Sequence, residues 1–151
     1  MQKVVITGHD LTVDQIIAVC REGAEVVLSD ESREKILASR QVVNELVEER
    51  KVVYGITTGF GKFSDVVISQ DECKLLQKNL IITHAVGAGD PFKEDIARGI
   101  LLLRVNSLSN GFSGICLETV ETMIAMLNKG VTPFIPEKGS LGASGDLAPL
   151  S

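Results

Sequence analysis

The chain has 151 residues, 44% of them hydrophobic, and a formal net charge of -5. This length suffices for one domain with a real core. The acidic balance argues against nucleic-acid binding, which depends on clustered Lys and Arg. No window approaches the roughly 18 uninterrupted apolar residues of a membrane span, and the N-terminus lacks the apolar stretch and cleavage site of a signal peptide.

The three cysteines, Cys20, Cys73 and Cys116, lie far apart along the chain in apolar contexts. Their odd number and wide spacing indicate reduced, packed thiols of a cytoplasmic protein, not a disulfide framework. With only His9 and His84 in addition, no zinc-ligand spacing exists. We therefore expect no metal site.

The first 50 residues predict two short strands, at 3–7 and 26–28, each followed by a helix. A capping box at 12–15 begins the first helix. The second helix is long and amphipathic and ends near residue 50, with a charged face that we interpret as solvated surface.

Residues 51–64 include three glycines and two threonines, which makes a helix improbable. A nucleotide loop of the form G-x-x-x-x-G-K-[ST] would need glycine at Ile56 and Ser or Thr at Phe63, so that interpretation fails. Tyr54 is the only tyrosine. A lone tyrosine is most often an amphipathic core residue with a hydrogen-bonded hydroxyl.

Helical periodicity and cap signals predict three further helices, at 69–84, 91–109 and 113–128. Asp90 followed by Pro91 has the form of an N-cap and first helical residue, and Ser113 is the expected cap of the last helix. Arg104 and Asn106 interrupt an apolar run and need polar partners if they are buried. The prediction is a mainly α fold with a few short strands near the N-terminus, in a single domain over residues 1–151.

The densest motif is the glycine-rich loop at 139–150. Its small side chains leave the carbonyl carbon of Ala143 open to attack by the amide nitrogen of Gly145, which would close a five-membered ring. Loss of water from the ring, and then of the Ser144 hydroxyl, would leave a conjugated methylidene group, a strong electrophile. Asp146 is placed to hydrogen-bond and orient the cyclising backbone.

Simpler interpretations compete for this loop. A Gly/Ser/Ala segment is usually just a turn. A serine-hydrolase elbow, G-x-S-x-G, would need glycine where Asp146 stands. A phosphate-binding loop would need a lysine and a Ser or Thr after the glycines, and neither is present.

The loop resembles the prosthetic-group segment of the aromatic amino acid ammonia-lyases. Two further segments carry the resemblance in matching order: residues 54–61 are similar to the family's catalytic tyrosine loop, and residues 77–87 to its substrate-pocket segment. The resemblance implies that Ala143, Ser144 and Gly145 cyclise autocatalytically to 4-methylidene-imidazol-5-one, supported by Gly142 and Asp146. No external cofactor is implied.

The resemblance also assigns roles to two side chains. Tyr54 falls on the tyrosine proposed as the family's base, although Thr57 departs from the asparagine that the family commonly has in this loop. His84 alone would more often be a structural histidine at a helix C-terminus. A small hydroxyl residue followed by histidine, here Thr83-His84, is the pattern of the histidine-specific members, so His84 is the expected substrate-binding residue.

We therefore expect elimination of ammonia from L-histidine to give trans-urocanate, by a homotetramer whose active sites combine several chains. A tyrosine or phenylalanine ammonia-lyase or aminomutase of the same family, and a non-enzymatic helical interaction domain, are the alternatives. Because the sequence stops at Ser151, directly after its densest motif, we expect an N-terminal fragment of a longer chain, without turnover by itself.

Overall fold

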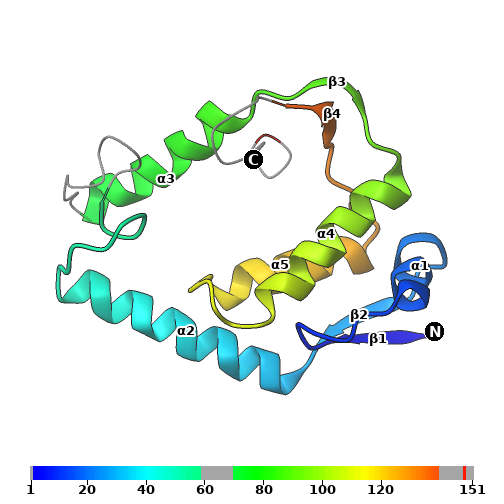
Figure 1. The fold of residues 1–151 in the computed structure, drawn as a ribbon, viewed down its shortest axis with the longest axis horizontal. Helices are drawn as coiled ribbons and strands as arrows, with labels where there is room; N and C mark the ends of the chain where they lie inside the picture. Colours follow the sequence, from blue (N-terminus) through cyan, green and yellow to red (C-terminus); the bar gives the residue numbers. More distant parts are fainter. Residues whose placement is uncertain (1, 59–69, 140–147, 149–151) are drawn as a thin grey trace. The chain divides into compact units, whose positions relative to one another are not determined.

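The computed structural model describes residues 2–58, 70–139 and 148. Most described residues are helical, which confirms the predicted mainly α class (Figure 1). None of the described helices is long and apolar enough to cross a membrane. The elements in chain order are β1 (Lys3–Ile6), α1 (Val13–Arg21), β2 (Glu25–Leu28), α2 (Asp30–Glu48), α3 (Gln70–His84), β3 (Ala88–Pro91), α4 (Glu94–Leu108), α5 (Leu117–Asn128) and β4 (Pro136–Lys138).

The chain divides into two compact units. The first consists of Met1–Val42 and Phe92–Phe134, and the second of Val43–Pro91 and Ile135–Ser151. Each unit is therefore assembled from two separate stretches of sequence.

The first unit begins with a β1–α1–β2 arrangement. The two strands pair in parallel, with Val4 opposite Val26, and α1 makes the crossover that parallel strands require. The predicted capping box is present: Thr12 Oγ1 accepts from the Gln15 amide at 3.3 Å, and Gln15 Oε1 accepts from the Thr12 amide at 2.9 Å. Both predicted strands and the helix between them are confirmed.

One hydrophobic core holds the first unit together. Helix α4 contributes Leu101, Leu102 and Val105 to this core, each at most 8% exposed. Burying a side chain of this size stabilises the fold by about 1.5–3 kcal/mol. The other buried members of the core are Val4, Ile6, Ala18, Val19, Ala24, Val26, Leu28, Ile36, Val120, Ile124 and Leu127.

Arg98 of α4 is buried in this unit, with only 8% of its surface exposed. Its Nη2 donates to the carbonyl oxygens of Val19 at 3.0 Å and Leu127 at 3.2 Å. These carbonyls lie in the last turns of α1 and α5, where backbone oxygens lack partners within the helix and the negative end of the helix dipole lies. Arg98 therefore joins the C-terminal ends of two helices.

Amide side chains complete the polar contacts of this unit. Asn128 Oδ1 accepts from the Val26 amide at 2.8 Å, and its Nδ2 donates to the Val26 carbonyl at 2.9 Å, so Asn128 pairs with β2 as a neighbouring strand would. Half-buried Asn106 has the polar partner that the sequence required, the amide of Gly8 at 3.2 Å, whereas Arg104 is exposed.

The second unit contains the antiparallel pair β3 and β4, which the sequence did not predict. Ala88 lies opposite Lys138, and Pro91 opposite Pro136. A Cβ atom on Gly87 would lie 2.4 Å from Cγ of Pro136, so only glycine allows the two segments to approach this closely.

The predicted start of α4 is wrong because of this strand pairing. Asp90 and Pro91 lie in β3, and the helix begins at Glu94 after Lys93, which makes no side-chain cap. The extended conformation of a paired strand excludes the helical dihedral angles that the Asp-Pro signal favours.

The predicted start of α5 at Ser113 is also wrong, since the helix begins at Leu117. Gly114 has a φ of +67°, its amide donates to Ser39 Oγ at 2.8 Å, and its carbonyl accepts from Arg40 Nη1 at 3.2 Å. These bonds to α2 hold the segment in a non-helical conformation.

We expect Arg98→Leu to lower the free energy of unfolding by about 1–3 kcal/mol. The substitution removes the Arg98 donor from the Val19 carbonyl and one of the donors of the Leu127 carbonyl, which keeps the Gly130 amide at 3.3 Å. Arg104→Leu, on the exposed side of the same helix, is the matched control and should change stability by less than about 0.5 kcal/mol. Urea unfolding followed by circular dichroism measures both. Equal effects of the two substitutions would contradict the capping role.

Candidate active site

Two of the predicted site residues, Tyr54 and His84, lie within the described part of the chain, both in the second unit. The other predicted residues lie outside the described residues: Gly142, Ala143, Ser144, Gly145 and Asp146. The structure therefore gives the contacts of Tyr54 and His84, whereas the properties of the loop follow from its sequence.

Tyr54 lies in a tight turn, as the glycine and threonine content of this stretch favours. Gly55 has a φ of +75°, a conformation that side chains other than glycine rarely adopt. The amides of Ile56 and Thr57 both donate to the Val53 carbonyl, at 3.1 and 3.0 Å. Tyr54 is 62% exposed. It therefore does not occupy the core position that a lone tyrosine most often has.

Thr57 closes this turn with its side chain, a contribution that the sequence does not predict. Only 5% of Thr57 is exposed. Its hydroxyl donates to the Lys51 carbonyl and accepts from the Val53 amide at 2.9 Å. Thr57, which stands where the family commonly has asparagine, therefore makes two polar side-chain contacts, both inside the turn.

His84 is the last residue of α3 and is half-buried. Its Nδ1 lies 2.7 Å from the Leu80 carbonyl oxygen, which also accepts from the Thr83 hydroxyl at 3.0 Å. A carbonyl oxygen only accepts hydrogen bonds, so Nδ1 carries a proton. In the neutral ring Nε2 is then the acceptor.

The pairing of β3 with β4 connects His84 with the glycine-rich loop. β3 begins at Ala88, four residues after His84, and its partner Lys138 is the last residue before the loop at 139–150. The pairing therefore brings the end of the segment that contains His84 close to Gly139, the first residue of the loop. Tyr54 also belongs to the second unit. The hydrogen bonds of its turn that are described above join only residues 51–57 to one another.

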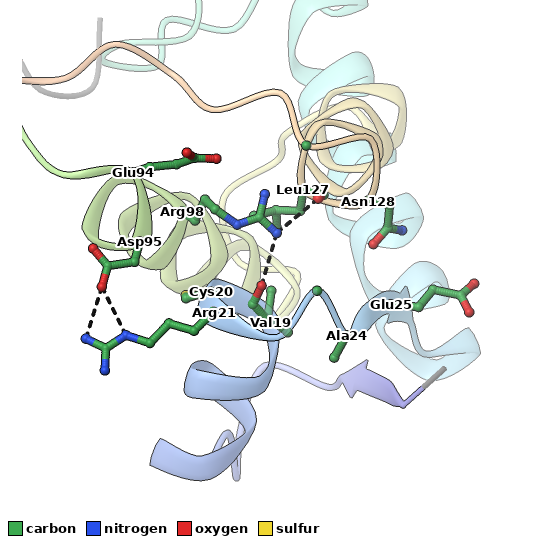
Figure 2. Close-up of a pocket in the computed structure, with 12 residues that line it drawn as sticks. Val19, Cys20, Arg21, Ala24, Glu25, Glu94, Asp95, Arg98, Leu127 and Asn128 are labelled. Atoms are coloured by element: carbon green, nitrogen blue, oxygen red, sulfur yellow. Dashed lines mark hydrogen bonds and ion pairs between the residues drawn. The ribbon is translucent and has the colours of Figure 1, made fainter.

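A cavity of about 760 Å³ lies in the first unit, and it contains none of the predicted site residues (Figure 2). Its charged side chains all have partners. Arg21 Nη2 lies 3.0 Å from Asp95 Oδ2, and Arg98 binds two carbonyl groups. Glu25 pairs with Lys3 at 3.4 Å, and Glu94 accepts from the Thr132 hydroxyl at 3.2 Å. Burial raises the pKa of the Cys20 thiol at its wall, which disfavours the reactive thiolate. The contacts assign this cavity to the scaffold.

Metal chemistry has no support in the described part of the chain. No group of three or more His, Cys, Asp or Glu side chains within residues 2–58, 70–139 and 148 is arranged to hold a metal ion.

Comparison with known proteins identifies relatives along the whole chain. The family model for aromatic amino acid lyase matches residues 11–151. Histidine ammonia-lyase of Caldanaerobacter subterraneus is 60% identical over all 151 residues, which span about 30% of its length. Among solved structures, histidine ammonia-lyase from Trypanosoma cruzi aligns with a TM-score of 0.90 and 42% identity, over 99% of this chain and 29% of that one. Tyrosine aminomutase from Streptomyces globisporus aligns with a TM-score of 0.89 and 38% identity, over 98% and 28%.

The hydrogen bond from His84 to Leu80 predicts an unusual tautomer for a histidine. In alkaline buffer, where imidazoles are neutral, nitrogen NMR of the histidine-labelled chain should show His84 protonated at Nδ1. Because His9 is the only other histidine, a His9→Gln variant assigns the signals. A His84 signal from the Nε2-protonated tautomer would contradict the geometry.

Proposed function

Since the chain belongs to the aromatic amino acid lyase family, we propose that it provides part of a histidine ammonia-lyase. The reaction is the non-oxidative elimination of ammonia from L-histidine to give trans-urocanate, a step in histidine degradation. The observation that carries the proposal is the 60% identity to a curated histidine ammonia-lyase over the entire chain. Because the chain spans about 30% of that relative, we propose turnover for the complete protein and none for these 151 residues alone.

The sequence at 143–145 fits the 4-methylidene-imidazol-5-one group that the family implies. Gly145 has no side chain to hinder its amide nitrogen, Ala143 has only a methyl group beside its carbonyl carbon, and Ser144 supplies a hydroxyl that can leave as water. Gly142 adds backbone freedom, and Asp146, which directly follows Gly145 in the sequence, is proposed to orient the cyclising amides. When formed, the group supplies an electrophile that engages the substrate, through its amino group or its imidazole ring, and so promotes the departure of ammonia.

The remaining requirement is a base for the weakly acidic β-hydrogen of the substrate. We assign this role to Tyr54, whose phenolate oxygen would accept the proton. Two observations support the assignment: Tyr54 is 62% exposed, and the turn that carries it is fixed by bonds from Thr57. A base held in one position loses less orientational freedom in reaching the reactive geometry.

His84 is proposed to select the imidazole ring of the substrate. With Nδ1 bound to the Leu80 carbonyl, Nε2 of the neutral ring can accept the N–H of a substrate imidazole. A phenyl ring has no such donor and would leave the acceptor unpaired. Sites built around a hydrogen bond reject analogues that lack the matching group much more strongly than apolar pockets do.

We further propose that the complete protein is a cytoplasmic homotetramer without nucleic-acid or membrane partners. The support for assembly is the apolar surface of α3, where Leu75, Ile81 and Ile82 are each 56–59% exposed. Apolar side chains gathered on one exposed helix are typical of a surface that another chain segment covers.

To test the activity, this chain replaces its matching segment in the Caldanaerobacter enzyme. We expect the chimera to convert L-histidine to urocanate, measured by ultraviolet absorbance, whereas the 151 residues alone should not. Ser144→Ala should slow the chimera at least about 1000-fold, equivalent to about 4 kcal/mol of barrier, because it removes the hydroxyl that must leave.

Intact mass supplies a readout that is independent of turnover. The active chimera should weigh two waters less than its sequence, and the Ser144→Ala variant should not show this deficit. An active chimera of full mass would overturn the role of residues 143–145. A chimera that carries the deficit but does not act on histidine would overturn the substrate.

The second candidate function is a tyrosine or phenylalanine lyase or aminomutase, favoured by the alignment with the tyrosine aminomutase. His84 distinguishes the two. In the chimera, His84→Leu should lower kcat/KM for histidine by about 10- to 100-fold, the cost of one unpaired polar contact, with a smaller change for tyrosine and phenylalanine. His9→Leu, in the first unit, is the matched control. Unchanged preference for histidine would contradict the role of His84.

A further inference from the structure

We infer that Thr57 is a positioning residue that aims Tyr54 by holding the backbone on its N-terminal side. The inference rests on the proposed role of Tyr54 as the base. Thr57 need not touch the substrate, since its bonds act through the main chain of the turn.

Thr57 binds both polar groups of Val53, the residue directly before Tyr54. Its amide donates to the Val53 carbonyl at 3.0 Å, and its hydroxyl oxygen accepts from the Val53 amide at 2.9 Å. With both groups fixed, the backbone at Val53 has little freedom to rotate. The direction in which the chain presents Tyr54 is then set.

The hydroxyl proton of Thr57 holds the entry to the turn by donating to the Lys51 carbonyl. The hydroxyl therefore uses its donor and one acceptor site on two backbone groups. Thr57 is 5% exposed, so little water is present to replace these bonds. Loss of the hydroxyl would leave the Val53 amide and the Lys51 carbonyl without partners.

Only the side-chain bonds depend on the identity of residue 57. The amides of Ile56 and Thr57 bind the Val53 carbonyl whatever their side chains, and Gly55 keeps its positive φ. A substitution at Thr57 should therefore loosen the turn without removing it. The effect should fall on the chemical step, which requires an accurately placed base, more than on substrate binding.

The geometry requires one acceptor and one donor at position 57. Asparagine offers both, through its carbonyl oxygen and its amide group. Valine, which has the shape of threonine, offers neither. Aspartate has the shape of asparagine but only accepts, so it cannot bind the Lys51 carbonyl and would set a charge against it.

The kinetic test uses these two matched pairs in the chimera. Thr57→Val should lower kcat about 10- to 100-fold, as expected for a misplaced reactive group, and change KM for histidine less than about threefold. Thr57→Asn should recover most of the lost kcat, whereas Thr57→Asp should not. Thr122→Val, which removes a hydroxyl bound to the Glu118 carbonyl in α5, is the control and should leave kcat unchanged.

A spectroscopic test needs no activity. Tyr54 is the only tyrosine and the chain has no tryptophan, so the tyrosine fluorescence anisotropy of the 151-residue chain reports on this side chain alone. Thr57→Val should lower the anisotropy, and Thr57→Asn should keep it close to that of the unsubstituted chain. Circular dichroism checks that the helices persist in each variant.

The outcomes separate this inference from the proposed function. Equal kcat and anisotropy for the Asn and Asp variants, or a Val variant that matches the unsubstituted protein in both, would overturn the positioning role. A chimera that is inactive on histidine with threonine at position 57 would overturn the proposed function, and the anisotropy would then decide whether Thr57 holds the turn.

Discussion

The antiparallel pairing of β3 with β4 is the constraint on which the candidate site depends. Ala88 and Lys138 are far apart in sequence, and closing so long a loop costs entropy that the pairing must offset. Gly87 allows the contact, because a side chain there would collide with Pro136. Ala88 lies four residues after His84, and Lys138 directly precedes the glycine-rich loop. This one pairing therefore connects the two segments.

The same kind of local bond lies at Tyr54 and at His84. In each case a side chain binds a backbone group four residues before it in the sequence. Thr57 binds the Val53 amide, and His84 binds the Leu80 carbonyl. Such bonds form within one turn of chain and do not require a packed core around them. The proposed base and the proposed substrate-binding residue can therefore be preorganised on a surface that is still exposed.

The sequence predicted elements whose signals are local. The capping box of Thr12 and Gln15 and the β-branched runs of β1 and β2 are complete within a few residues, and all appear in the structure. The strands β3 and β4 were missed because their pairing is long-range. At Asp90 and Ser113 a local cap signal was overridden by tertiary bonds, to β4 in one case and to α2 in the other.

The same distinction applies to the site. Tyr54 and His84 could be proposed because they stand in specific motifs. The structure adds the bonds of the turn that carries Tyr54 and the bond of His84 to the Leu80 carbonyl. The role of Thr57 could not be predicted, because its partners are backbone groups of Lys51 and Val53, which every sequence provides. When a side chain binds only main-chain atoms, no second residue type is required, so the sequence contains no pair of residues that would indicate the contact.

The two units differ in how many of their described side chains are fully buried. Apart from Thr58, the large described side chains that are less than 2% exposed belong to the first unit. In the second unit, a two-stranded pair and a hydrogen-bonded turn hold the candidate site, while α3 exposes Leu75, Ile81 and Ile82. A two-stranded pair is at best marginally stable on its own. Local bonds orient Tyr54 and His84 individually, but further apolar surface is needed to hold the segments of this unit together. This supports our proposal that turnover belongs to the complete assembly.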